Sequence, residues 1–308
     1  MPGHDQLFKD LLRSFFPEFV RLAVPDVAGE LGLDQTRFLD KEAFADLPSG
    51  SRSEADLLSE VPTRGRRTKL LLIHVEIEGR FRAAMDRRMW RYYLSISLRY
   101  GLPVLPILVT LRGGPGGLIE RSFSQRVGDR EVCRFTYTVF GLEHSVAEKI
   151  SPEAGALAPA LAALMQSQAM SRAEQKIWCL EAVARSWVDD AGRFLLVNVI
   201  ETYLQLDSEE RAEYEGLLQQ ERHREARSME MTWADQMQEV GRQAGFRDGL
   251  VEGARRVLVS ILERRFGPLD RSAVEKIQAL ADPGDIERLS EEALTAPSAT
   301  ELLGSFPG

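Results

Sequence analysis

The 308-residue sequence predicts an α/β protein, in which a mixed β-sheet flanked by helices is followed by an all-helical C-terminal region. Three observations predict this architecture. The segment KLLLIHVEIEG ends in alternating apolar and polar residues, which indicates a strand. The run PVLPILVTL is apolar and bounded by turn residues, which indicates a second, buried strand. After about residue 150, apolar residues recur at helical spacing and strand-like alternation does not return.

The N-terminal elements follow from local signals. Leu7 and Leu11 share one face of a helix that begins after Asp5, a candidate N-cap, and ends at Pro17. The segments ADLLSEV and KLLLIHVEIEG, separated by the turn PTRGRR, predict a β-hairpin. Residues 82–100 then read as a helix rich in arginine and aromatic residues. The sheet therefore starts with an antiparallel pair and continues beyond a helix.

The remaining elements complete this order. PVLPILVTL is expected to be a buried central strand, and REVCRFTYTVF alternates along its length and predicts another strand. From SPEAGALAPALAALM onward only helices are expected, and the chain ends in a small helical tail. We therefore expect three regions: a sheet domain over residues 1–145, a helical region over 146–240, and a glycine-containing tail over 241–308.

A glycine repeat marks the start of the tail. Gly241, Gly245, Gly249 and Gly253 are spaced by four residues, so they would line one face of a helix. One interpretation is a flexible or loosely helical linker, because glycine weakens a helix through its conformational entropy. The other is a seam that allows close helix packing. The repeat itself does not choose between them.

Composition excludes several classes of protein. With 44% hydrophobic and 28% charged residues, the chain is neither disordered nor collagen-like. Its apolar runs are too short to cross a bilayer, and residues 1–12 lack the features of a secretory signal. Cys133 and Cys179 lie far apart and outside any CxxC motif, which argues against a disulfide framework or a zinc site. We therefore expect a cytoplasmic protein with no membrane partner.

Charge is distributed unevenly along the chain. The formal net charge is −8, yet residues 64–99 carry ten Lys or Arg side chains against three acidic ones. Residues 207–239 reverse this balance, with ten acidic side chains against four basic ones. A basic segment within an acidic protein is the electrostatic pattern that neutralises a DNA backbone. The sequence has no P-loop, dinucleotide-binding or nucleophile-elbow motif, which are the usual signatures of nucleotide and serine-hydrolase chemistry.

Three carboxylates form the most informative cluster. Glu76 and Glu78 share one face of the second hairpin strand, about 6.6 Å apart along it, and Asp56 lies on the first strand. Mg²⁺ is held by one or two carboxylates, so Asp56 and Glu76 are sufficient candidate ligands. The alternative is the solvated face of an exposed strand. We favour the metal site because the strand begins with three leucines, because the acids lie in the basic segment, and because Glu76 and Glu78 repel each other without a cation.

The helix over 82–100 carries a candidate DNA surface. Arg88, Arg91 and Arg99 lie near one face, where they would contact phosphates. Met85, Met89, Tyr92 and Ile96 share another face, and this pattern is typical of a helix packed on a core. Arg88 pairing with Glu78 or Asp86 is the structural alternative. His74 precedes Glu76 on the same strand face, but a structural histidine is the simpler interpretation than a transition-metal ligand.

These segments also resemble a known family. An acidic residue at one strand, a hydrophobic strand ending in E-x-K or E-x-Q, and a helix with Arg and Tyr are the pattern of the PD-(D/E)XK nuclease superfamily. HDQLFKDLL, ADLLSEV, LLLIHVEIEGR and DRRMWRYYLSISLRYGLPVLPILV resemble, in this order, the bacterial recombination-promoting nucleases, also labelled putative transposases. The resemblance covers residues 4 to about 111 and continues more loosely to the glycine repeat and the tail.

The resemblance implies a PD-(D/E)XK-like sheet domain and a Mg²⁺- or Mn²⁺-dependent DNA endonuclease linked to recombination or mobile DNA. It implies that Asp56 and Glu76 bind the metal, with the backbone carbonyl of Ile77 as a third ligand. The family has Lys or Gln where this sequence has Glu78, so Lys9 on the N-terminal helix is the candidate for supplying the missing cation, and a plain surface lysine is its alternative. Arg88 and Tyr92 match the family's R-x-x-x-Y positions, so we expect Tyr92 to contact DNA together with Arg88, Arg91 and Arg99.

Two other functions remain open at this stage. Because Glu78 departs from the family pattern, the fold could bind DNA without cleaving it. The acidic helical region and the glycine repeat also suit an interaction scaffold, with homo-oligomers formed through the C-terminal helices.

Overall fold

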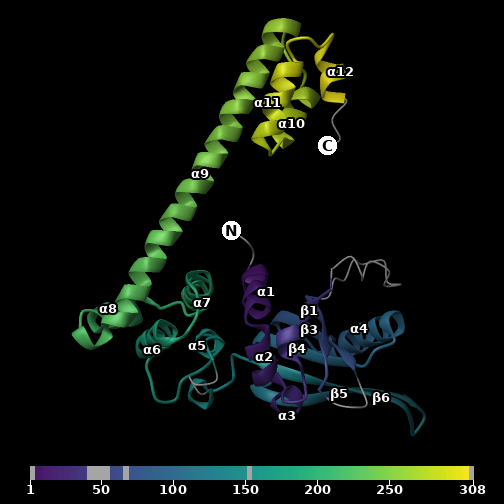
Figure 1. The fold of residues 1–308 in the computed structure, drawn as a ribbon, viewed down its shortest axis with the longest axis vertical. Coiled ribbons are helices and arrows are strands. Elements are labelled where there is room, and N and C mark those ends of the chain that lie inside the picture. Colours follow the sequence, from purple (N-terminus) through teal and green to yellow (C-terminus); the bar gives the residue numbers. More distant parts are fainter. Residues whose placement is uncertain (1–3, 40–55, 65–68, 151–154, 305–308) are drawn as a thin grey trace. The chain divides into compact units, whose positions relative to one another are not determined.

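The computed structural model describes residues 4–39, 56–64, 69–150 and 155–304 (Figure 1). It forms two compact units, residues 1–233 and 234–308. The boundary expected at residue 145 lies inside the first unit, because helices that follow it share a hydrophobic core with the N-terminal helices and the sheet. Each unit is described separately below.

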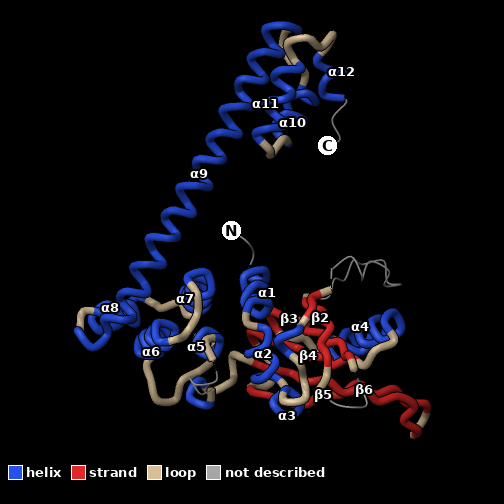
Figure 2. Tube along the Cα trace, viewed as in Figure 1, coloured by secondary structure: helices blue, strands red, loops and turns tan. Residues whose placement is uncertain are grey.

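A six-stranded mixed sheet is the centre of the first unit (Figure 2). Its strand order is β1-β2-β3-β4-β6-β5. Strands β2 and β3 pair antiparallel, which confirms the predicted hairpin, although residues 65–68 of its turn lie outside the described residues. The β3–β4 and β4–β6 pairs are parallel, and β5–β6 and β1–β2 are antiparallel. The strands are β1 (Arg37–Phe38), β2 (Leu57–Pro62), β3 (Leu70–Arg80), β4 (Val104–Arg112), β5 (Gly117–Val127) and β6 (Arg130–Gly141).

The sequence did not predict strand β5. Its residues are all partly or fully exposed, because β5 lies at the edge of the sheet and pairs only with β6. The segment LIERSFSQRV alternates, but it lacks the apolar run that marked β4. A polar edge strand therefore depends on its neighbour for its strand conformation, and local hydrophobicity gives a weak signal for it.

The two faces of β3 pack against different parts of the protein, because successive side chains of a strand point in opposite directions. Ile73, Val75 and Ile77 pack into the large core on one face. His74 and Glu76, of the alternate set, are buried on the other face. Helix α4 (Met85–Tyr100) covers this second face and buries Met85, Met89, Tyr92 and Ile96. Glu76 therefore lies between the sheet and α4.

The N-terminal segment forms two helices instead of one. Helix α1 (His4–Ser14) ends before Phe15, and α2 (Phe16–Ala23) begins with Pro17 in its first turn. The expectation that Pro17 ends the helix is therefore wrong: a first-turn proline loses no hydrogen bond, because the first N–H groups of a helix have no partner within it. Short turns follow, α3 (Pro25–Ala28) and a 3₁₀ helix at Leu33–Gln35.

Four helices and the first turns of a fifth complete the first unit and pack against α1, α2 and the sheet in a shared core. Side-chain caps define where three of them begin: Ser171 for α6, Asp189 for α7 and Asp207 for α8. The all-helical expectation after residue 150 holds for the described residues, apart from an isolated bridge between Val146 and Gln166. The helices are α5 (Leu157–Ala162), α6 (Arg172–Arg185), α7 (Asp190–Tyr203) and α8 (Ser208–Leu218), with 3₁₀ turns at Ala147–Lys149 and Glu221–His223.

Helix α9 (Arg224–Phe266) contains the glycine repeat. The repeat is therefore helical, and a loosely helical linker and a packing seam both remain compatible with it. The second unit packs α9 with α10 (Arg271–Ala279), α11 (Pro283–Glu292) and α12 (Ala299–Gly304) around a small core that includes Leu258, Ile277 and Leu289. Of the helices in the described ranges, none has the length and apolar character that a membrane span requires.

Candidate functional site

Lys9 and Asp56 form the first part of the site. Asp56 lies one residue before β2, and Lys9 is on α1. The Nζ atom of Lys9 is 2.7 Å from Oδ1 of Asp56, and both side chains are largely buried. The other carboxylate oxygen, Oδ2, accepts a 2.7 Å hydrogen bond from the backbone N–H of Ile77. Asp56 is thus held against β3 by one charged and one backbone donor.

Glu76 lies next to Asp56 on the neighbouring strand. In the antiparallel register Leu57 is opposite Val75, so continuing by one residue brings Asp56 opposite Glu76. Burial raises the pKa of Asp56 above its ordinary value of 3.8, and the adjacent Glu76 raises it further, while Lys9 and the Ile77 N–H oppose the rise. Two carboxylates therefore share a weakly hydrated site.

Arg88 joins both glutamates of β3 to helix α4. Its guanidinium bonds to Oε1 of Glu76 through Nη2 and to Oε2 of Glu78 through Nη1, the latter at 3.0 Å. The predicted alternative partner Asp86 is engaged elsewhere. Tyr92 is one turn further along α4, and its hydroxyl lies 3.4 Å from Nε and Nη2 of Arg88. Neighbouring acids raise the pKa of Arg88, although its burial acts in the opposite direction.

Glu76 and His74 contribute buried polar atoms to the site. Both side chains are fully buried. Within the described part of the chain, Oε2 of Glu76 and both ring nitrogens of His74 lack a hydrogen-bond partner. The closest approach between them, from Nε2 of His74 to Oε2 of Glu76, is 3.7 Å, too long for a hydrogen bond. An edge-on contact with the ring of Tyr92 holds the His74 imidazole, with ring centroids 5.2 Å apart.

The donor set fits a hard divalent cation in one specific way. Asp56 and Glu76 offer carboxylate oxygens from adjacent strands, and one of these oxygens is buried without a hydrogen-bond donor. No group of three or more His, Cys, Asp or Glu side chains arranged to hold a metal occurs among the described residues. Mg²⁺ does not need such a cage, because it is commonly held by one or two carboxylates together with waters and substrate phosphates. The donor set is therefore that of a two-carboxylate site, with one buried carboxylate oxygen available to a cation.

The other predicted site residues divide into two groups. Arg91 and Arg99 are exposed on α4, as a phosphate-contacting surface requires. Tyr92 is 2% exposed, so the expectation that it contacts DNA does not fit: its ring packs against the core, and its hydroxyl faces Arg88. The side chain of Ile77 is also buried, so only its backbone could serve the site.

The sequence did not predict one polar cluster, which lies on the face of the sheet that α4 covers. The carboxylate of Asp86 accepts hydrogen bonds from Nε and Nη2 of Arg121, at 2.9 and 2.8 Å, and from the hydroxyl of Tyr137 at 2.6 Å. The hydrogen bond from Arg121 lowers the pKa of Asp86 and the one from Tyr137 lowers it further, although burial opposes both. Arg121 lies on the unpredicted strand β5, so no local signal linked it to Asp86. The cluster ties α4 to β5 and β6.

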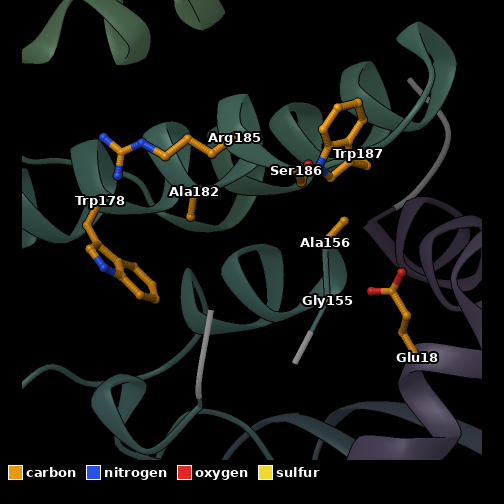
Figure 3. Close-up of a pocket in the computed structure, with 8 residues that line it drawn as sticks. All are labelled: Glu18, Gly155, Ala156, Trp178, Ala182, Arg185, Ser186 and Trp187. Carbon is orange, nitrogen blue, oxygen red and sulfur yellow. The ribbon is translucent and has the colours of Figure 1, made fainter. Parts of the chain in front are cut away.

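A cavity of about 460 Å³ lies away from these residues (Figure 3). It is lined mainly by α6 and the residues after it, including Trp178 and Arg185, with Glu18 of α2 on the opposite side. Its charged side chains already have partners: Arg185 bonds to Glu181 and Glu225, and Glu18 accepts the backbone N–H of Leu157. This cavity therefore lacks the reactive groups that the β3–α4 site brings together.

Comparison with known proteins identifies no relative. No protein-family model matches the chain, and neither the curated proteins nor the solved structures include a match. What the site can do is therefore inferred from its residues and their geometry. The site contains the neighbouring carboxylates of Asp56 and Glu76. Lys9 forms an ion pair with Asp56, and Arg88 bridges Glu76 to Glu78.

Proposed function

We propose that the protein is a metal-dependent DNA endonuclease with a PD-(D/E)XK-like sheet domain. The observation that carries the proposal is the pairing of Asp56 with Glu76 in a buried site beside the ammonium of Lys9. Lys9 and Arg88 offset part of the repulsion between the two carboxylates, and a bound metal ion would satisfy the remaining buried oxygen, Oε2 of Glu76. The order of the elements, an acid at one strand, a hydrophobic strand ending in E-x-E, and a helix with Arg88 and Tyr92, supports the same proposal.

Each residue has a proposed role. Asp56 and Glu76 would hold Mg²⁺ or Mn²⁺, with the Ile77 carbonyl as a third ligand. When bound, such an ion polarises a phosphoryl oxygen and lowers the pKa of a bound water. Lys9 would orient the attacking water and stabilise the charge that develops on the phosphate, the role that a motif lysine would have at the position of Glu78. Its contact with Asp56 supports this assignment.

Helix α4 supplies the proposed DNA contact. Arg87, Arg91 and Arg99 are exposed, and the same helix holds the guanidinium of Arg88 at the carboxylates. Phosphate contacts of this kind position the backbone without reading its sequence. We therefore expect binding that weakens steeply as the salt concentration rises. We also propose that this cleavage serves recombination or the movement of mobile DNA, as the resemblance implies.

The decisive experiment is nicking of supercoiled plasmid by the full-length protein in Mg²⁺ and in Mn²⁺. Asp56→Asn and Glu76→Gln should each abolish nicking. Glu120→Gln is the matched control, because Glu120 is an exposed carboxylate on β5 of the same sheet. Nicking that persists in both site variants would overturn the proposal.

A second function is favoured by one specific observation. Arg88 bonds to both Glu76 and Glu78 and so occupies oxygens that a metal would use. In a fold that has lost cleavage, this ion-pair network would simply replace the metal and leave a DNA-binding surface. Filter binding that shows salt-dependent DNA affinity, together with no nicking in either metal, would support this alternative over the nuclease.

A further inference from the structure

Helix α9 carries an exposed apolar stripe in the second unit. Phe246, Leu250 and Val257 are 65%, 50% and 56% exposed. Together with Gly253 they follow one another at spacings of four, three and four residues, so all four lie along one face of the helix. We name these four residues the α9 stripe. Large apolar side chains repeated on one face at this spacing are typical of a helix that packs against another helix.

The packing within the second unit does not cover the stripe. The face of α9 that packs against α10–α12 carries Val251, Leu258 and Leu262, which lie on another side of the helix. A Cβ built on any glycine of the repeat would meet nothing within 4 Å. Each glycine in a helix costs roughly 1 kcal/mol relative to alanine, so α9 carries four such costs where its own chain provides no packing. Of these glycines, only Gly253 belongs to the stripe, and it leaves room there for a side chain of another helix.

We infer that a second copy of this chain covers the α9 stripe, with the two α9 helices antiparallel. The pattern is self-complementary about a twofold axis between Leu250 and Gly253. In this register Leu250 packs over Gly253 of the second copy, and Phe246 packs against Val257 of the second copy. Leu250 thus meets a glycine and Phe246 meets a valine, and the glycine allows the two helices to approach closely.

Charge complementarity selects this arrangement. Glu239 and Arg264 extend the stripe at its two ends, with the same spacing of seven residues from Phe246 and from Val257. Both residues are exposed, and Glu239 also accepts hydrogen bonds from Arg242 and Gln243 of its own helix. The antiparallel register brings Glu239 of one copy opposite Arg264 of the other, twice in each dimer. A parallel pair would instead bring Glu239 onto Glu239 and leave Gly253 opposite Gly253 with no side chain between them.

Sedimentation equilibrium of the full-length protein tests the inference. Wild type should dimerise, and Val257→Glu should raise the dimer dissociation constant roughly a hundredfold, because each dimer would then bury two charges. Val240→Glu is the matched control, since Val240 is exposed on the same helix but lies about 100° away from the stripe. It should leave dimerisation unchanged. Circular dichroism should show equal helix content in all three proteins.

A charge exchange identifies the register. Glu239→Arg and Arg264→Glu should each weaken the dimer, and the protein with both substitutions should recover it. A monomeric wild type, an equal effect of Val257→Glu and Val240→Glu, or no recovery in the double variant would overturn the antiparallel pair. The inference does not rest on the proposed nuclease function: Asp56→Asn should dimerise like wild type, so the two can fail separately.

Discussion

The ammonium of Lys9 lies 2.7 Å from Oδ1 of Asp56, although one residue belongs to the first helix and the other precedes a strand of the hairpin. Neither residue is near the other in the chain. The contact depends on α1 packing its apolar face, including Phe8, Leu11 and Leu12, into the core on which the sheet also packs. Burial of apolar neighbours therefore delivers a charged group to the candidate site.

Replacing Lys9 with the uncharged Met should reduce plasmid nicking at least about tenfold, because a positioned cation at the reacting phosphate is lost. Lys69→Met is the control, since Lys69 is exposed at the start of the β3 region. The measurement is the initial rate of conversion of supercoiled to open-circular plasmid. Equal rates for Lys9→Met and wild type would reduce Lys9 to a structural partner of Asp56.

Asp56→Asn should stabilise the protein by about 1 kcal/mol at pH 7 in metal-free buffer, as is common where a site residue is strained for function. Burial and Glu76 raise the folded-state pKa of Asp56 above 3.8, so the wild type loses stability as the pH rises from 3.8 through the folded pKa. The advantage of the variant should therefore be absent near pH 3.8 and grow above it. Urea unfolding across this range measures it; a destabilised variant at pH 7 would contradict the prediction.

Arg88→Met should destabilise the fold by about 1–3 kcal/mol, because Glu76 is fully buried and would lose the cation that bonds to it. The loss is smaller than for a fully buried pair, since the Arg88 side chain is 44% exposed. Arg87→Met should change stability by less than about 0.5 kcal/mol, because Arg87 is a neighbouring exposed arginine of the same helix. Urea denaturation compares them.

The double variant Arg88→Met/Glu76→Gln provides the internal check on this pair. It should be less destabilised than the sum of the two single variants, since the buried charge is removed together with its partner. Strict additivity would mean that the bond between Arg88 and Glu76 contributes no coupling to the fold.

Asp86→Asn should destabilise the protein by about 1 kcal/mol at neutral pH through weaker hydrogen bonds to Arg121 and Tyr137. The folded-state pKa of Asp86 lies below 3.8, so its contribution is complete above that value and is lost as the pH falls through the folded pKa. The difference between variant and wild type should thus shrink in acid, the reverse of the behaviour expected at Asp56. A difference independent of pH, in thermal unfolding against a Glu120→Gln control, would contradict it.

Gly155→Ala should cost about 2 kcal/mol or more, because Gly155 has a φ of +124° and a Cβ there would lie 2.3 Å from the Glu18 carboxylate (Figure 3). That carboxylate accepts the N–H of Leu157 and would have to leave it. Gly29→Ala is the control: its φ is −66° and nothing lies within 4 Å of its Cβ. Melting temperatures of the two variants check the prediction, which fails if they are equal.

The sequence determined much of the local structure. Period-two alternation predicted β3 and β6, the apolar run predicted β4, and the apolar spacing on 82–100 predicted α4. The shared face of Glu76 and Glu78 and the choice of Asp56 as their neighbour also came from the sequence. These features follow from short-range patterns, because each depends on the direction in which successive side chains of one element point.

Only the tertiary structure decided how the site is assembled. Helices that pack on the two faces of one sheet bring Lys9 to Asp56. The same packing brings Arg88 to Glu76 and Glu78 and buries Tyr92. Strand β5 forms because its backbone pairs with the edge of β6, and the composition of β5 alone does not predict this pairing. Periodicity specifies which face of an element is apolar, whereas packing between distant elements specifies which charged groups meet.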